Sequence, residues 1–187
     1  MGNSNKIYHF RNAILRNRFA LRRISFKRSF TLSLLLASDV FLLDQVSKWL
    51  LLRIIPSPSS PPIELTSFFN LALVWNHGIS FGMFAAHRHP FPLIALSLVI
   101  VVILLKWLYK NSSRWIAVAL GCIIGGAVGN VVDRLRFGAV VDFFDAHIGP
   151  YHWPAFNIAD SAIFIGVVLL CASSIMNPMS KSCESRK

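Results

Sequence analysis

Four long runs of apolar residues divide the chain. They cover residues 30–52, 91–109, 115–134 and 158–176. The hydrocarbon core of a bilayer is about 30 Å thick, and an α-helix that rises about 1.5 Å per residue crosses it with about 20 residues. No run alternates apolar and polar positions as the strands of a membrane barrel do, and lipid accepts only spans that satisfy their own backbone groups. The pattern therefore predicts an all-α membrane protein built as a bundle of four transmembrane helices.

The composition agrees with this prediction. Of the 187 residues, 55% are hydrophobic and 14% are charged, whereas soluble domains carry about 25% charged residues. A disordered chain or a nucleic-acid-binding tail would be polar, so these classes are excluded. The cysteines, Cys122, Cys171 and Cys183, and the histidines lack the spacing of metal ligands. We expect no disulfide framework, no metal and no cofactor.

The net charge of +11 is concentrated near the N-terminus. Eight of the 19 Lys and Arg residues precede the first acidic residue, Asp39. Such an acid-free block is typical of a solvated segment attracted to phosphate, either of nucleic acid or of a membrane surface. The apolar runs favour the membrane, and no nucleic-acid partner is expected. We therefore divide the chain into a basic arm (residues 1–29), a single membrane-embedded domain (residues 30–177) and a tail (residues 178–187).

The remaining charges predict the orientation, because loops rich in Lys and Arg stay in the cytoplasm. With the N-terminus inside, the cytoplasmic segments hold the arm, the basic residues between 106 and 114 and the basic C-terminal tail, while the opposite loops are near neutral. Both termini are thus expected in the cytoplasm. A cleaved signal peptide is a less favoured alternative, because Asp39, Asp44 and Lys48 interrupt the first run. An organellar transit peptide is a second alternative for the arm.

Ionisable residues inside or beside a span are costly, so each is a candidate for function or for a buried pair. Asp44 and Lys48 are four residues apart and share a helix face. They either form an internal ion pair or lie near a substrate. Asn130, Asp133 and Arg134 form one polar face at the end of the third run. There an ion pair within or between helices is expected.

A stripe of glycines precedes that polar face. Gly121, Gly125 and Gly129 recur every four residues. Small residues at this spacing let another transmembrane helix approach closely. We expect the stripe to be a packing surface.

Two further acids stand near the outer ends of the third and fourth runs. Asp142 follows the third run, and Asp160 lies one turn into the fourth. Two carboxylates brought close together cannot both ionise easily, so one keeps its proton while the other activates a water, as in aspartic proteases. The residues alone leave two other interpretations open. One is a proton- or ion-coupled carrier or its accessory subunit, and the other is a scaffold subunit whose acids are all in ion pairs.

Four stretches carry a family resemblance. They are DQVSKW at residues 44–49, NLALVWNHGISFGMF at 70–84, GGAVGNVVDRLRFGAVVDFF at 125–144 and PAFNIADSAIFIG at 154–166. In this order they resemble the lipoprotein signal peptidases (signal peptidase II), the bacterial membrane aspartic peptidases. The motifs GN-x-x-DR, V-x-DF and FN-x-AD at the ends of two spans are specific. The long arm and the Pro-rich loop after Arg53 are not part of the pattern, which leaves the edges of the outer loop open.

The resemblance implies that Asp142 and Asp160 are the catalytic pair. It implies that nine other residues bind substrate or shape the site: Asp44, Lys48, Asn76, Gly78, Asn130, Asp133, Arg134, Asn157 and Ala159. The implied substrate is a prolipoprotein whose Cys carries a diacylglyceryl group, cut on the N-terminal side of that Cys.

The resemblance also implies a small extracytoplasmic β-like cradle and a short loop helix beside the bundle. Residues 63–84 have the right position, being rich in apolar residues but broken by Asn76, Gly78 and Gly82. This segment is too short to span, and we expect a half-buried strand and loop over the bundle. The implied location is the bacterial inner membrane, with the site near the extracytoplasmic face. Membrane lipids and substrate are the expected partners of a monomer.

Overall fold

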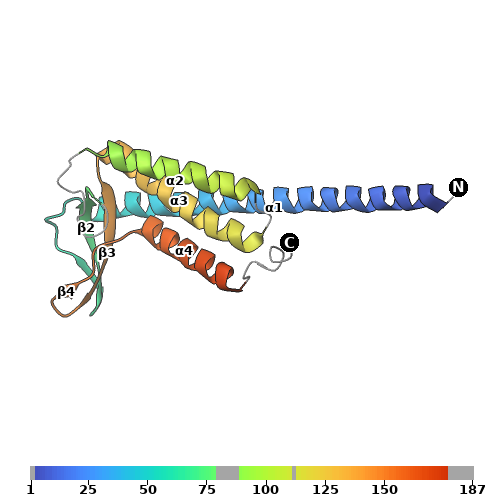
Figure 1. The fold of residues 1–187 in the computed structure, drawn as a ribbon. Coiled ribbons are helices and arrows are strands. Elements are labelled where there is room, and N and C mark those ends of the chain that lie inside the picture. The colour runs from blue at the N-terminus through green and yellow to red at the C-terminus, as the bar shows by residue number, and fades with distance from the viewer. Residues whose placement is uncertain (1–2, 79–88, 111–112, 177–187) are drawn as a thin grey trace, which may run out of the picture.

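The computed structural model describes residues 3–78, 89–110 and 113–176, with side chains from residue 28 onward. The elements follow one another as α1 (Asn3–Ile54), β1 (Ile63–Thr66), β2 (Phe69–Asn76), α2 (Phe91–Lys110), α3 (Arg114–Phe137), β3 (Val140–Ile148), β4 (Tyr151–His152) and α4 (Ile158–Met176). Four helices lie roughly side by side, and the strands gather at one end of the bundle (Figure 1).

The helices confirm the four predicted spans. Segments long and apolar enough to cross a membrane are Arg28–Ile54, Phe91–Lys110, Arg114–Phe137 and Ile158–Met176. Each differs from its predicted boundaries by only a few residues. The fold is thus a four-helix membrane bundle with a small antiparallel sheet.

The first helix is longer than its apolar run. The basic arm, expected as a solvated segment, has a helical backbone from Asn3 and continues α1 well beyond the bundle (Figure 1). The sequence contains neither Gly nor Pro between Asn3 and Ile55, so no residue there interrupts helical hydrogen bonding. Pro56 then disfavours the helical conformation of the preceding residue, and α1 ends at Ile54.

Helix α3 lies at the centre and is packed closely because of its glycines. A Cβ atom on Gly121 would lie 2.8 Å from the Ser33 carbonyl oxygen of α1, and one on Gly125 would lie 2.5 Å from that of Ala37. The predicted stripe is therefore the face that packs on α1. Gly126 points the other way and leaves no room for a Cβ beside the Ala159 carbonyl of α4.

The sheet has the strand order β1-β2-β3-β4 and is antiparallel throughout. Strands β1 and β2 confirm the strand expected between residues 63 and 84. Strand β3, which was not predicted, pairs with β2 so that Val74 lies opposite Asp142 and Trp75 lies opposite Val141. The described residues between the first two spans hold no helix. Residues 79–88 of that connection lie outside them, so the loop helix stays a prediction.

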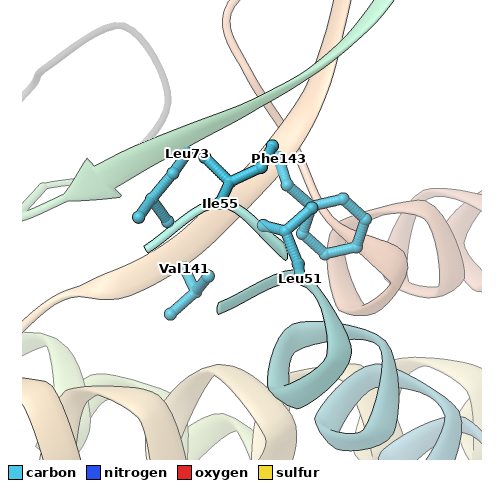
Figure 2. Packing of buried hydrophobic residues seen from close by; sticks show 5 residues of the cluster. All are labelled: Leu51, Ile55, Leu73, Val141 and Phe143. Atoms are coloured by element: carbon cyan, nitrogen blue, oxygen red, sulfur yellow. The ribbon is translucent and has the colours of Figure 1, made fainter. Parts of the chain in front are cut away.

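A hydrophobic cluster attaches the sheet to the end of α1. Leu51 and Ile55 from α1 and the turn that follows meet Leu73 of β2 and Val141 and Phe143 of β3 (Figure 2). All five side chains are at most 5% exposed. Because Val141 and Phe143 flank Asp142 on β3, this packing fixes the strand segment that carries the Asp142 carboxylate.

Candidate active site

Asp142 and Asp160 come from different elements and are joined by one asparagine. Asp142 lies on β3, and Asp160 lies in the first turn of α4. The Asn157 side chain donates from Nδ2 to Asp142 Oδ1 at 2.6 Å, and its Oδ1 accepts a hydrogen bond from the Asp160 backbone N–H at 2.9 Å. The two aspartates expected from the sequence are therefore neighbours in space.

The start of α4 fixes the orientation of Asp160. Asn157 precedes the helix and accepts the hydrogen bond from the Asp160 backbone, while the Asp160 carboxylate accepts one from the Asn157 N–H at 3.4 Å. This is the reciprocal arrangement of a capping box. Asn130 Nδ2 of α3 donates to the other Asp160 oxygen at 2.8 Å. Both oxygens of Asp160 are thus held by hydrogen-bond donors.

Asp142 is held in the same way by amides on both of its oxygens. Asn157 donates to Oδ1, and Asn76 of β2 donates to Oδ2 at 2.9 Å. The Asn76 side chain is itself oriented, because its Oδ1 accepts the Gly78 backbone N–H at 3.0 Å. Asp142 is 1% exposed. Burial, followed by the nearby charge of Asp160, raises the pKa of Asp142 from 3.8 to about 7.

A buried cation lies behind the carboxylates. Lys48 Nζ lies 2.8 Å from Asp44 Oδ2 and 2.7 Å from Asp133 Oδ2. It also donates to Asn130 Oδ1 at 3.3 Å. The predicted pair within α1 is present, and the ion pair expected for Asp133 joins α3 to α1.

This charged cluster is hydrogen-bonded to both segments that carry the two aspartates, β3 and the start of α4. Asp44 Oδ1 accepts a hydrogen bond from the Ala159 N–H at 3.0 Å, and Asp133 Oδ2 accepts one from the Val141 N–H at 3.2 Å. Ala159 immediately precedes Asp160, and Val141 immediately precedes Asp142. Asp44 and Asp133, which Lys48 bridges, therefore fix the backbone immediately before Asp160 and Asp142, respectively.

Gln45 is a member of this cluster that the sequence analysis missed. Its Nε2 donates to Asp133 Oδ1 at 2.9 Å and lies 3.2 Å from Asp44 Oδ2. The cost of burying charge identifies ionisable groups in a span, whereas Gln45 carries a neutral amide. Its position next to Asp44 is the signal that could have identified it.

Arg134 faces a different part of the site. It donates to the Asn130 carbonyl oxygen at 3.3 Å and to the Gly78 carbonyl oxygen at 3.1 Å. It thereby connects α3 to the end of β2. Arg134 and Gly78 lie together on the wall of a cavity, so the structure brings these two predicted residues to the same site as Asp160.

The cavity has a volume of about 840 Å³ and lies between α2 and α4. Its polar wall includes Asn76, Asn130, Arg134 and Asp160. The rest is mainly apolar and comes from the two helices and the loop before α4: Leu93, Leu96, Ile100, Trp153, Pro154, Phe156, Ile163, Phe164, Ile165 and Val167. A ligand in this cavity would contact mainly apolar side chains and, at the polar part of the wall, the Asp160 carboxylate.

Other acids and thiols lie apart from this site. Asp145 of β3 accepts a hydrogen bond from Asn70 and pairs with His152 at 2.7 Å on the sheet. Cys122 and Cys171 are free thiols, and Cys183 lies outside the described residues. Among the residues that the structure describes, no group of three His, Cys, Asp or Glu side chains is arranged to hold a metal ion.

A family model and curated relatives agree on one family, and a solved structure has a similar fold. The model of the family described as signal peptidase (SPase) II matches residues 36–176. A lipoprotein signal peptidase of Sphingopyxis alaskensis is 42% identical over 146 residues, covering 76% of this chain and 84% of the relative. One of Desulforapulum autotrophicum is 44% identical over 150 residues, covering 76% and 91%. A bacterial membrane enzyme solved by the in meso method is similar with a TM-score of 0.70 at 29% identity, covering 83% of this chain and 94% of that chain.

Proposed function

The chain belongs to the signal peptidase II family, and we propose that it removes signal peptides from prolipoproteins through the carboxylates of Asp142 and Asp160. Family membership decides for the peptidase over the carrier and scaffold interpretations. The observation that carries the assignment of the pair is the Asn157 side chain, which hydrogen-bonds to the Asp142 carboxylate and to the Asp160 backbone. Asparagine side chains donate to three of the four carboxylate oxygens, and the Asn157 backbone N–H donates to the fourth, Asp160 Oδ2. None of these donors carries a charge that would neutralise the carboxylates.

In the proposed reaction the two acids have different roles. Asp160, on the cavity wall and in the first turn of α4, is the ionised base, because a helix N-terminus favours negative charge. Asp142, whose pKa is raised to about 7, carries the proton. Asp160 takes a proton from water as the water oxygen bonds to the scissile carbonyl carbon, and Asp142 gives its proton to the carbonyl oxygen. As the tetrahedral intermediate collapses and the C–N bond breaks, the leaving amine takes the proton that Asp160 received from water, and the hydroxyl that becomes the new carbonyl returns its proton to Asp142.

The lining of the cavity supports the proposal that the substrate is lipid-modified. Its apolar walls come from α2 and α4, two membrane-spanning helices, and Asp160 lies at its polar part. A diacylglyceryl group on the substrate Cys would fill the apolar part and place the bond on the N-terminal side of that Cys at the carboxylates. Binding energy far from the reacting bond is thereby used to position it.

The proposed location follows from the charges. The strands and the site lie at one end of the bundle, and the basic arm extends from the other end (Figure 1). Basic segments are retained in the cytoplasm. This orientation places the site near the extracytoplasmic face of the bacterial inner membrane, with both termini inside. Asp44, Lys48, Asp133 and Ala159 would position the carboxylates, while Gly78 and Arg134 would shape the substrate channel of a monomer.

The test is cleavage of a diacylglyceryl-modified precursor by purified protein in lipid vesicles. Removing one acid–base group costs about 10²- to 10⁴-fold in rate, so we expect Asp142→Asn and Asp160→Asn each to lose at least about 10²-fold. Asp145→Asn is the matched control, because Asp145 lies on β3 with Asp142 but contacts Asn70 and His152. An unlipidated precursor should remain uncut. An active Asp142→Asn or Asp160→Asn variant would contradict the carboxylate pair.

A further inference from the structure

The β3–β4 hairpin has two chemically different faces. Residues directly opposite each other on paired strands share a face, and neighbours along a strand alternate. His147 lies opposite His152, and Ile148 lies opposite Tyr151. One face therefore carries the imidazoles, whose rings stack 4.9 Å apart, together with Asp145, which pairs with His152 at 2.7 Å. The other face carries Ile148 and Tyr151.

The apolar face is the most exposed apolar surface of the sheet. Ile148 is 83% exposed and Tyr151 is 81% exposed. Trp153 continues the alternation two residues after Tyr151, with its backbone N–H donating to the Ala146 carbonyl oxygen at 2.7 Å, and is 65% exposed. An exposed cluster of an aliphatic residue, a tyrosine and a tryptophan on one face marks an interaction surface.

This face is continuous with the membrane-facing part of the molecule. Trp153 lines the same cavity as Phe164 of α4, whose side chain is 70% exposed on a membrane-spanning helix. The hairpin projects from the strand end of the bundle on the side of α4, away from α2 (Figure 1). Tyrosine and tryptophan are enriched where a protein meets the lipid headgroups, because each has an apolar ring and a polar group.

We propose that the apolar face of the hairpin, Ile148 and Tyr151 with Trp153 at its base, inserts into the boundary between headgroups and acyl chains of the outer leaflet. The polar face carries Asp145, His147 and His152, and its exposed member, His152, is directed to water. Neither face carries Lys or Arg, so the insertion depends on apolar and aromatic contacts and does not require anionic lipid. The anchor holds the mouth of the cavity at headgroup depth. It is independent of the chemistry assigned to the carboxylates.

Spin labels on the hairpin test this proposal in the full chain. In a background of Cys122→Ala, Cys171→Ala and Cys183→Ser, nitroxides are attached after Ile148→Cys, Tyr151→Cys or His152→Cys, and the protein is placed in phosphatidylcholine vesicles. Oxygen concentrates in the bilayer, whereas a nickel chelate stays in water. We expect labels at positions 148 and 151 to relax more strongly with oxygen than with the chelate, and the ratio to reverse at the matched control position 152.

Three results would overturn the anchor. In the first, the ratio of oxygen to chelate relaxation at positions 148 and 151 matches that at position 152. In the second, the labels at 148 and 151 become protected from the chelate only when a precursor is added. In the third, they become protected only at raised protein density in the vesicle. The last two would assign the face to substrate or to a second copy of the chain. If the cysteine-free chain does not fold, Ile148→Trp and His152→Trp in the native chain replace it. Brominated phosphatidylcholine should then quench the added fluorescence of the first variant and leave that of the second unquenched. Quenching of both or of neither would reject the proposal.

Discussion

The side chains around Asp142 explain why its pKa is raised. Asp142 is buried and receives amide hydrogen bonds on both oxygens, which favour its ionised form, yet burial and the charge of Asp160 outweigh them and raise its pKa to about 7. The neutral amides are important here, because a cation in their place would lower the pKa of Asp142 and remove the acid. Asp142 thus retains a proton up to near neutral pH, as the proposed reaction requires.

A pH profile follows from this pKa. If Asp142 donates a proton, kcat/KM should fall as the pH rises through about 7, where the ligand-free folded protein loses that proton. The same shift affects stability. Between its ordinary value of 3.8 and about 7 the unfolded chain has released a proton that the folded chain retains, so the Asp142 contribution to the free energy of unfolding falls as pH rises across this window.

Infrared spectroscopy measures this pKa through the protonated carboxyl band that Asp142→Asn removes. Asp160→Asn should lower the pKa of Asp142, because it removes the like charge that raises it. Asp145→Asn should leave the band unchanged. A band whose titration is unaffected by Asp160→Asn would contradict coupling between the two acids.

Lys48 is expected to be a strong determinant of stability. It is 2% exposed and contacts the carboxylates of Asp44 and Asp133. Lys48→Met would leave both acids buried without their cation, and breaking such a pair typically costs about 3–5 kcal/mol. Thermal unfolding in detergent should show this loss. Lys106→Met, at an exposed position of α2, should unfold at the temperature of the unchanged chain, and equal stability of the two variants would show that the cluster is not a structural support.

Sequence reasoning located the individual polar residues better than it located their partners. Asp142, Asp160, Asp44 and Lys48 were identifiable because charge beside or inside an apolar run is costly. The backbone hydrogen bonds to Asp44 and Asp133 could not be predicted, because they depend on how α1, α3 and β3 meet in space. The spacing of residues within one helix can indicate a packing face, as the glycine stripe does, but not which backbone N–H of another element a carboxylate will meet.

At the level of elements, helix α3 depends on the absence of side chains at its glycines. A methyl group at Gly125 would lie 2.5 Å from the Ala37 carbonyl oxygen and 2.9 Å from the Ala37 Cα atom. Because both are backbone atoms, Gly125→Ala must separate α1 from α3. Overpacking typically costs about 1–3 kcal/mol, and we expect a loss of this size in unfolding measurements.

The matched control adds a methyl group elsewhere on the same helix. Val118 is half-buried, and Val118→Ile should change stability little. A separation of α1 from α3 would also stretch the contacts from Lys48 to Asp133, so Gly125→Ala should reduce cleavage as well as stability. Full activity in that variant would show that the site does not depend on the spacing of these helices.

The pattern of apolar positions predicts the membrane-spanning helices more reliably than the strands. Runs of about 20 apolar residues have one structural solution in lipid, which explains why all four spans were predicted. Strand β3 was missed because residues 140–143 are all buried, so this stretch lacks the alternation that identifies a strand with one solvated face. The helical backbone of the arm was missed because its charge suggested a solvated segment, although no Gly or Pro interrupts it.

At the scale of the whole molecule, the alternating direction of the four spans in the described residues has a simple consequence. Helices α1 and α3 run toward the strands, and α2 and α4 run away from them (Figure 1). The connections α1–α2 and α3–α4 therefore supply all the strands at one end. There Asn76 Nδ2, from the first connection, donates a hydrogen bond to Asp142 Oδ2, from the second, at 2.9 Å. The site is thus completed only when both helical pairs are inserted with the same orientation.

The basic arm should therefore not be needed for the cleavage reaction. The family model begins at residue 36, and the site contacts lie at the opposite end of α1, beyond Asp44. Removal of residues 2–27 should leave kcat unchanged for correctly inserted protein. It should lower the inserted fraction with the N-terminus inside, because a basic residue near an anionic membrane surface contributes about 1 kcal/mol. Protease protection of a C-terminal tag in cells measures that fraction, and replacing the eight basic residues of the arm by Gln separates charge from length. A loss of kcat in the truncated protein would show that the arm belongs to the peptidase domain.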